Sequence, residues 1–151
     1  MPPLKPDLAV LPVQRADRFG NAHHWGNRGL VFEAAMAAEK VILLADEIVE
    51  PEVIASDPSR VLLAGCLVTA VCHVPAAVHP SPMTGRWQRD NAFFNDYHRR
   101  SRSREGFLEW LDEWVLGPPD HAAYREKLGA GLERLRIVGA APAAETNFAA
   151  A

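Results

Sequence analysis

The first third of the chain has an order of segments that few folds can accommodate. An apolar run, LAVLPV at 8–13, leads into a polar loop, and an alanine-rich helical segment, GLVFEAAMAAEK at 29–40, follows it. A second apolar run, VILLADEIV at 41–49, comes directly afterwards. Near-continuous apolar runs are typical of parallel strands buried on both faces, and parallel neighbours need a crossover such as this helix. The order therefore predicts an α/β fold with an open, largely parallel sheet.

The middle of the chain continues the sheet. We expect a short strand at 61–64, a third substantial strand at 66–74, and an irregular, proline-rich loop at 79–85. A parallel sheet of three or four strands has two open edges, and such edges must be covered. The strand pattern therefore indicates that this chain is one part of something larger.

The second half reads as helical. Apolar residues at helical spacing predict helices over 87–100 and 104–116, and a third helix that begins after Gly117-Pro118-Pro119. Asn27, Ser103 and Asp120 are the expected N-caps of the helices that follow them. We expect residues 1–138 to form a single α/β domain, and the alanine-rich segment 139–151 to be a flexible tail.

Bulk composition excludes several classes of protein. The 151 residues carry a net charge of −3 with a pI of about 6.1, which does not point to nucleic acid or to an anionic membrane as a partner. No apolar run approaches the ~18 residues of a spanning helix, and the N-terminus lacks the pattern of a signal peptide. These features favour a cytoplasmic protein. Cys66 and Cys72 are expected to be buried, unpaired thiols.

Six residues at the ends of the predicted strands and in one loop are candidates for a functional site. In open α/β sheets ligands bind beyond the carboxyl ends of the strands, which is where the first two strands place most of these residues. The candidates are Gln14, Asp17, Gly20, Asn21, Glu47 and His79. Each also has a structural interpretation. Asp17 and Asn21 can hold their own loop, Glu47 can be a solvated strand end, and His79 can be a hydrogen-bonded loop residue.

Two further patterns favour a structural interpretation. His23 and His24 are adjacent and point to opposite faces of an extended segment, and no spacing of histidines, cysteines and carboxylates indicates a metal site. The stretch 86–104 is rich in arginine, which suits a ligand that carries phosphate groups, but Asp90, Asp96 and Glu105 balance much of that charge.

Several segments, in order, resemble those of one family. They are PDLAVLPVQRADRFGN, EAAMAA, a strand ending in Asp46-Glu47-Ile48-Val49, LVTAVCHVP with the His79-Pro80 pair, and EWLDEWVLGPPDHAAYREKLG. Together they are similar to the A (alpha) subunits of family I CoA-transferases, the glutaconate and 3-oxoacid group. The resemblance covers roughly residues 5–129 and departs from the family at Ala77-Val78, where a glycine and an alanine usually precede the His-Pro pair.

The resemblance implies a partial CoA-transferase-like fold of the NagB/RpiA type, with a C-terminal helical segment. It implies that the chain is the C-terminal half of an A-type subunit. Its partners would be the missing N-terminal half and a B (beta) subunit that carries the nucleophilic glutamate. Acyl-CoA would be bound as the reactant, with coenzyme A as a substrate and no bound cofactor. The six candidate residues would then line the cleft or an interface, and no catalytic residue is assigned to this chain.

Two alternatives stay open at this point. The chain is also similar to subunits thought to hydrolyse a ring in a CoA-linked substrate of steroid degradation. It could equally be a truncated, non-catalytic binding or assembly module. In each case we expect the isolated chain to be inactive in CoA transfer.

Overall fold

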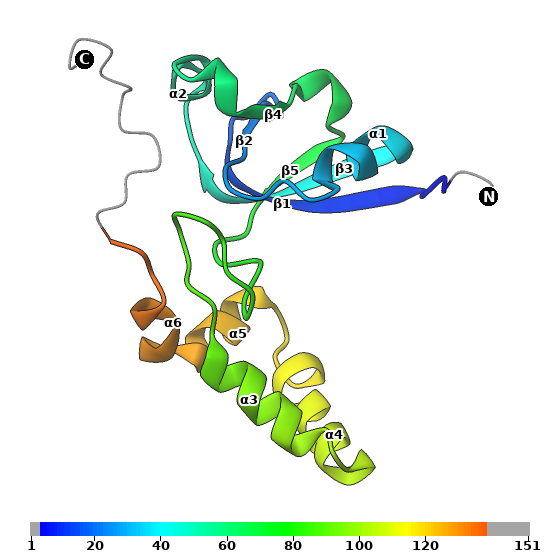
Figure 1. The fold of residues 1–151 in the computed structure, drawn as a ribbon, viewed down its shortest axis with the longest axis vertical. Helices are drawn as coiled ribbons and strands as arrows, with labels where there is room; N and C mark the ends of the chain where they lie inside the picture. Colours follow the sequence, from blue (N-terminus) through cyan, green and yellow to red (C-terminus); the bar gives the residue numbers. More distant parts are fainter. Residues whose placement is uncertain (1–3, 139–151) are drawn as a thin grey trace. The chain divides into compact units, whose positions relative to one another are not determined.

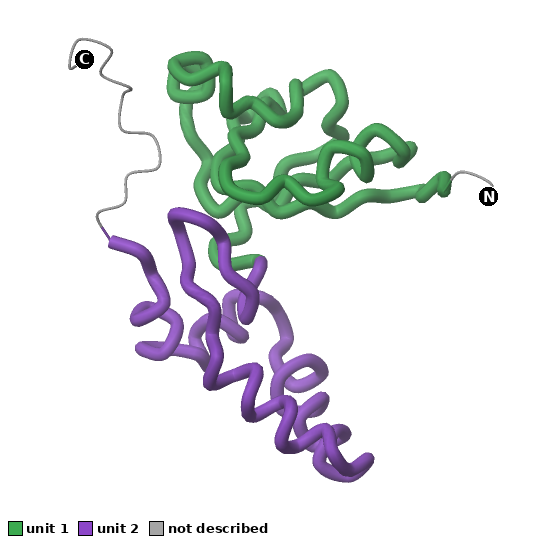
Figure 2. Tube along the Cα trace, in the orientation of Figure 1, with its two compact units in different colours: residues 1–77, 139–151 green, residues 78–138 purple. Residues whose placement is uncertain are grey.

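The computed structural model describes residues 4–138, which divide into two compact units, 4–77 and 78–138 (Figure 2). The first unit carries all strands of the five-stranded sheet, and the second is mainly helical (Figure 1). The expectation of a single domain over 1–138 stays a prediction. The tail expected at 139–151 lies outside the described residues.

The sheet of the first unit is open and mostly parallel, as predicted. Its strand order is β4-β2-β1-β3-β5. The three strands β1 (Leu8–Ala16), β3 (Lys40–Ile48) and β5 (Ala70–His73) run parallel. Two very short strands, β2 (Ala22–His23) and β4 (Val61–Leu63), add an antiparallel edge. The first strand is longer than its apolar run, so Gln14 lies in the strand and not in a loop.

One face of the sheet forms the core of this unit. Ala9, Leu11 and Val13 of β1 lie in register with Val41, Leu43 and Ala45 of β3, and all are buried. Helix α1 (Val31–Ala37) covers this face and buries Ala35 against it. The small alanine side chains allow the helix to pack close to the sheet, because they add little bulk between the two backbones.

The opposite face is only partly covered by residues 4–138. We call Leu8, Val10, Ile42, Leu44, Ala70 and Cys72 the open sheet face, because strand register places them together there. Leu8 and Val10 are 46% and 50% exposed, although both are large and apolar. The apolar runs predicted strands buried on both faces, and in the described residues the burial is one-sided over this part of the sheet.

Two local predictions in the first unit are wrong. Cys66 and Cys72 are unpaired but exposed, since Cys66 lies in the helical turn η2 (Gly65–Leu67) and Cys72 in the edge strand β5. Asn27 does not cap α1, whose first turn begins after Leu30. Its Oδ1 instead accepts the amide proton of Gly29 at 3.0 Å, which closes a local turn. Helices α2 (Pro51–Ala55) and η1 (Pro58–Arg60) complete the unit.

The second unit contains the helices α3 (Asn91–Arg100), α4 (Arg104–Leu111), α5 (His121–Leu128) and α6 (Ala130–Arg134). Helix α4 ends in a π-helical turn, η3 (Asp112–Leu116), closed by a bond from Gly117 N–H to Asp112 O at 2.7 Å. Asp120 caps α5 as predicted, and Asp90 caps α3. No helix within residues 4–138 combines the length and the apolar character needed to span a membrane.

Ser103 also caps its helix as predicted, since its Oγ accepts from Gly106 N–H at 3.1 Å. Replacing Ser103 by alanine should lower the free energy of unfolding by about 1 kcal/mol, because one amide donor of the first turn loses its partner. Urea unfolding followed by circular dichroism measures the change. Ser103→Asp preserves an acceptor at this position and serves as the matched control. A Ser103→Ala protein as stable as the parent would contradict this role for the hydroxyl.

Candidate functional site

Asp17 organises the turn that follows β1. Its carboxylate is 1% exposed and accepts three hydrogen bonds. Oδ1 accepts from the amides of Phe19 at 2.8 Å and Asn21 at 3.0 Å, and Oδ2 accepts from Asn21 Nδ2 at 2.8 Å. The turn 17–21 is therefore held by its own polar side chains, which is the structural interpretation of this loop.

Asn21 and Gly20 connect this turn to a distant segment. Asn21 Oδ1 accepts from Gly65 N–H at 2.9 Å, across 44 residues of sequence. Gly20 has a φ of +87°, and a Cβ there would lie 2.9 Å from the Cβ of Val68. Both the backbone conformation and the close approach to Val68 thus require glycine at position 20. Sequence reasoning placed these residues in one loop but could not find their partner.

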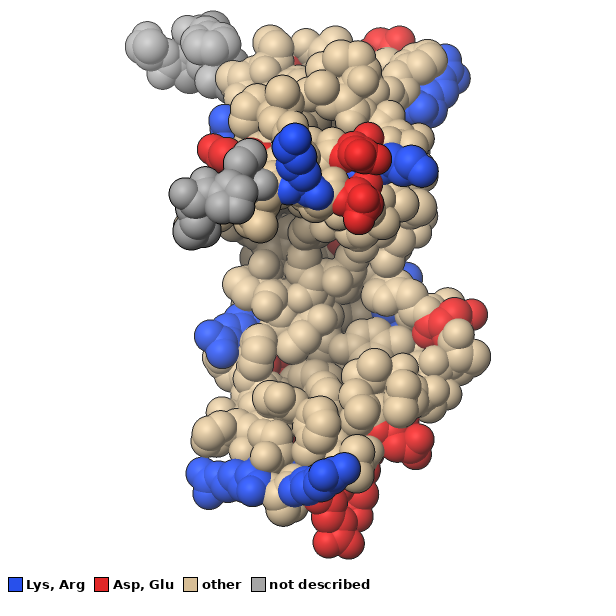
Figure 3. All heavy atoms as spheres, turned by 90° about the vertical axis from the view of Figure 1, so that its right-hand side faces the viewer, with Lys and Arg blue, Asp and Glu red and all other residues tan. Residues whose placement is uncertain are grey.

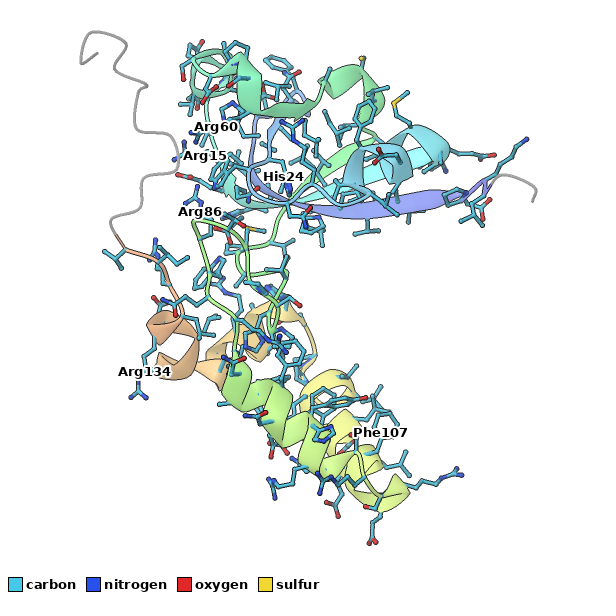
Figure 4. All side chains as sticks on the ribbon, viewed as in Figure 1. Arg15, His24, Arg60, Arg86, Phe107 and Arg134 are labelled. Carbon is cyan, nitrogen blue, oxygen red and sulfur yellow. The ribbon has the colours of Figure 1, made fainter. Side chains whose placement is uncertain are left out.

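Gln14 and Glu47 are positioned by the strands that carry them. Gln14 is buried in β1, and its Nε2 donates to Trp25 O at 2.9 Å. Glu47 of β3 lies in register with Arg15 of β1, and the two form an ion pair with 2.9 Å between Nε and Oε2. Arg15 and Arg60 also approach the ring of Trp25, with their guanidinium carbons 5.9 and 5.6 Å from its centroid. Figure 4 labels both arginines.

A shallow hollow of about 420 Å³ adjoins the turn. It lies beside the ends of β1 and β3, where open α/β sheets commonly bind ligands. The hollow is lined by Asp17–Gly20, Ile48, residues 68–71 and His73. The structure thus places Asp17 and Gly20 in the wall of this hollow. His73 is a lining residue that sequence reasoning missed, because its position on an edge strand gives no local signal.

His79 belongs to the helical unit, where it sits at the centre of a hydrogen-bonded chain. Its Nε2 lies 3.2 Å from Asp90 Oδ2, and its Nδ1 lies 2.6 Å from the hydroxyl of Tyr124. A neutral imidazole has one donor and one acceptor. An Nε2–H donor to Asp90 and an Nδ1 acceptor for Tyr124 O–H satisfy all three groups. Asp90 and Tyr124 are 11 and 45 residues away from His79, so no short motif could have revealed them.

Burial, and to a lesser degree the charge of Asp90, raise the pKa of Tyr124 to about 12. In a pH titration we expect its phenolate to form with a midpoint near that value, against about 10 for an unfolded tyrosine. The folded state then binds more protons than the unfolded state between these two values, so this contribution to stability is lost as the pH rises through that window. The absorbance difference between the parent and Tyr124→Phe isolates this group. A midpoint near 10 would contradict the buried setting.

Two arginines of the stretch 86–104, Arg99 and Arg100, are paired with neighbouring acids. Arg100 Nη1 lies 2.6 Å from Glu113 Oε2 and 3.6 Å from Asp96 Oδ2, and the hydrogen bond to Glu113 raises the arginine pKa further. Arg99 pairs with Asp96. Figure 3 shows basic and acidic side chains interspersed on the face it presents. This arrangement favours the interpretation of a solvated helix face. Within residues 4–138 no group of three or more histidines, cysteines or carboxylates could hold a metal ion.

No family model matches the chain, but known proteins do. It is 37% identical over 131 residues to the A subunit of 3-oxoadipate CoA-transferase from Pseudomonas knackmussii, and the match covers 87% of this chain and 46% of that protein. It is 35% identical over 133 residues to the A subunit of glutaconate CoA-transferase from Acidaminococcus fermentans, with coverages of 87% and 42%. The chain therefore spans just under half the length of these relatives.

Two solved structures are similar to this chain as well. The crystal structure of glutaconate coenzyme A-transferase from Acidaminococcus fermentans matches with a TM-score of 0.83 at 34% identity, over 88% of this chain and 42% of that one. A variant of the decarboxylase AibA/AibB matches with a TM-score of 0.60 at 26% identity, over 73% and 40%. The described residues share the fold of the matching part of glutaconate coenzyme A-transferase. The similarity to A subunits of CoA-transferases that the sequence segments indicate is confirmed over the matched part of the chain.

Proposed function

We propose that this chain forms part of the A subunit of a CoA-transferase-like enzyme, which moves CoA from an acyl-CoA to an acceptor carboxylate. The 37% identity to the A subunit of 3-oxoadipate CoA-transferase carries the proposal, and the fold similarity to glutaconate coenzyme A-transferase supports it. The names of these relatives point to dicarboxylic acids as the acyl group. Coenzyme A would enter as a substrate, with no bound cofactor, and a cytoplasmic location stays a prediction.

The exposure of the open sheet face is the observation that supports the partners named in this proposal. Large apolar side chains on a free surface mark places where another protein segment packs. Leu8 and Val10 are such residues, and so are Phe32 and Met36 of α1, which are 44% and 55% exposed. We infer that a B subunit, together with the missing N-terminal half of the A subunit, covers these surfaces in the complete enzyme.

The proposed reaction uses a nucleophilic glutamate of the B subunit. Its carboxylate attacks the thioester carbonyl and releases the CoA thiolate, which leaves a mixed anhydride. The thiolate then attacks the glutamyl carbonyl, which frees the first carboxylate and leaves a glutamyl-CoA thioester for the acceptor. In this chain Glu47 is paired with Arg15 in the sheet, which does not suit a nucleophile. Gln14, Asp17, Gly20, Asn21, Glu47 and His79 are proposed to form cleft walls or interface.

A chimera tests this function. In the 3-oxoadipate enzyme of Pseudomonas knackmussii, the aligned 131-residue segment is replaced by this chain, and the chimera is co-expressed with the cognate B subunit. We expect a stable complex that transfers CoA to 3-oxoadipate from an acyl-CoA donor, and no transfer by the isolated chain. Hydroxylamine trapping of the glutamyl-CoA thioester identifies the covalent step.

Two controls make the result interpretable. A B subunit with its nucleophilic glutamate replaced by glutamine should assemble without transfer. A chimera carrying Gly131→Ala should behave as the parent chimera, because a Cβ there meets nothing within 4 Å. A complex that assembles and hydrolyses its CoA substrate without transfer would overturn the proposal in favour of a hydrolase. Failure to associate with the B subunit would favour a separate binding module.

A further inference from the structure

The helical unit contains a second concave site that the proposed function does not use. It is a pocket of about 500 Å³, a size that suits a small organic ligand. Its walls come from α3, α4, η3, α5 and the loop before α3. The lining residues are His79, Pro80, Phe93, Trp110, Trp114, Val115, Pro118, Asp120, His121 and Tyr124. Aromatic rings dominate this set.

The rings meet edge to face and so form walls at steep angles to one another. The ring centroid of Phe93 lies 5.5 Å from that of Trp110 and 5.0 Å from that of Trp114, with interplanar angles of 71° and 70°. The ring centroids of Trp114 and Tyr124 lie 6.2 Å apart, and the angle between the ring planes is 82°. Near-perpendicular rings turn their faces in different directions, and any ring face that reaches the pocket attracts an organic cation.

One acidic residue lies in the pocket wall. The lining includes Asp120 but neither lysine nor arginine. Asp120 caps α5 through Oδ1. Because Tyr124 O–H donates to His79 in the arrangement described above, the phenol oxygen can accept a further hydrogen bond from a ligand.

One ring beside the pocket already has a cationic partner. Lys127 Nζ lies 4.5 Å from the centroid of Trp114, although Lys127 is not a lining residue.

We propose that this pocket binds a small organic cation with an apolar body, of which a quaternary ammonium is the simplest kind. The rings supply cation–π attraction, the carboxylate of Asp120 supplies the counter-charge, and Val115 with the prolines contacts the apolar part. The site lies wholly within the helical unit. It goes beyond the proposed function and does not depend on it, because binding is measured on the full chain without any CoA substrate.

The test compares two ligands of equal shape. Choline carries a trimethylammonium group, and 3,3-dimethyl-1-butanol has a carbon in place of its nitrogen. Isothermal titration calorimetry at pH 8 and low salt measures both affinities. We expect choline to bind about tenfold more tightly than the alcohol, and added salt to weaken only choline. Equal affinities, or no binding of choline at millimolar concentrations, would overturn the proposal.

Variants of the chain locate the binding. Asp120→Asn removes the charge but retains an equally good N-cap, and we expect choline to bind at least threefold more weakly. Trp114→Leu should weaken it about tenfold. Leu4→Ala, at an exposed position of the sheet unit, is the control and should bind as the parent does. If Trp114→Leu does not fold, Asp120→Asn decides, and unchanged choline affinity in that variant would place the binding elsewhere.

Discussion

Replacing Gly65 by alanine will lower the free energy of unfolding by about 3 kcal/mol, because the added methyl group has no room. A Cβ at this position would lie 2.9 Å from the carbonyl carbon of Phe19 and closer still to its oxygen. These are backbone atoms and cannot rotate away, so the turn 17–21 would have to move. That movement would also break the bond between Gly65 N–H and Asn21 Oδ1.

Urea unfolding followed by circular dichroism measures this effect, and Gly131→Ala is its counterpart. Nothing lies within 4 Å of a Cβ at position 131, which is in helix α6. An alanine in place of a helical glycine should stabilise by up to about 1 kcal/mol. The two substitutions should therefore shift the midpoint in opposite directions. A Gly65→Ala protein that unfolds at the parent's midpoint would show that the two loops can separate at no cost.

Asp17→Ala should cost about 3 kcal/mol, a loss of similar size with a different cause. The carboxylate is buried and serves two amide donors and one side-chain donor, all of which lose their acceptor in the alanine variant. Buried donors without partners are expensive, and bonds to a charged acceptor are stronger than neutral ones.

The Asp17→Asn variant separates the contribution of the hydrogen-bond acceptor from the contribution of the negative charge. Its Oδ1 can still accept from the amides of Phe19 and Asn21, but its Nδ2 would face the Asn21 amide nitrogen. We expect an intermediate loss of stability. Asp7→Ala, at an exposed position, should change stability by less than about 0.5 kcal/mol. A loss in Asp17→Ala no larger than in Asp7→Ala would refute the role assigned to the carboxylate.

Sequence reasoning succeeded where the signal was local. The order of β1, α1 and β3 follows from apolar runs and an alanine-rich helix, and Ser103 and Asp120 lie where an N-cap must be. It failed where a neighbouring residue changed the outcome. The Asn27 side chain accepts a hydrogen bond from Gly29 N–H instead of capping the helix. Gly29 has a non-helical φ of +51°, and α1 begins only at Val31. Cys66 was expected in a strand but lies in a helical turn.

The sequence predicts where the candidate site lies but not the long-range contacts that shape it. The turn after β1 could be proposed because open sheets bind ligands at strand ends, and the structure places a hollow there. The contacts that shape the site join residues far apart in sequence, such as Asn21 with Gly65 and His79 with Tyr124. No periodicity or spacing encodes such pairs. The role of the six candidate residues in a CoA cleft stays a prediction.

The open sheet face also bears on how much of this protein a cell can hold. A newly made copy displays Leu8 and Val10 to solvent until something covers them. Chaperones and proteases act on exposed apolar segments, and a small change in the uncovered population alters steady-state abundance severalfold. In the proposed complex, a copy whose open sheet face is uncovered would therefore be degraded sooner than a copy whose face is covered.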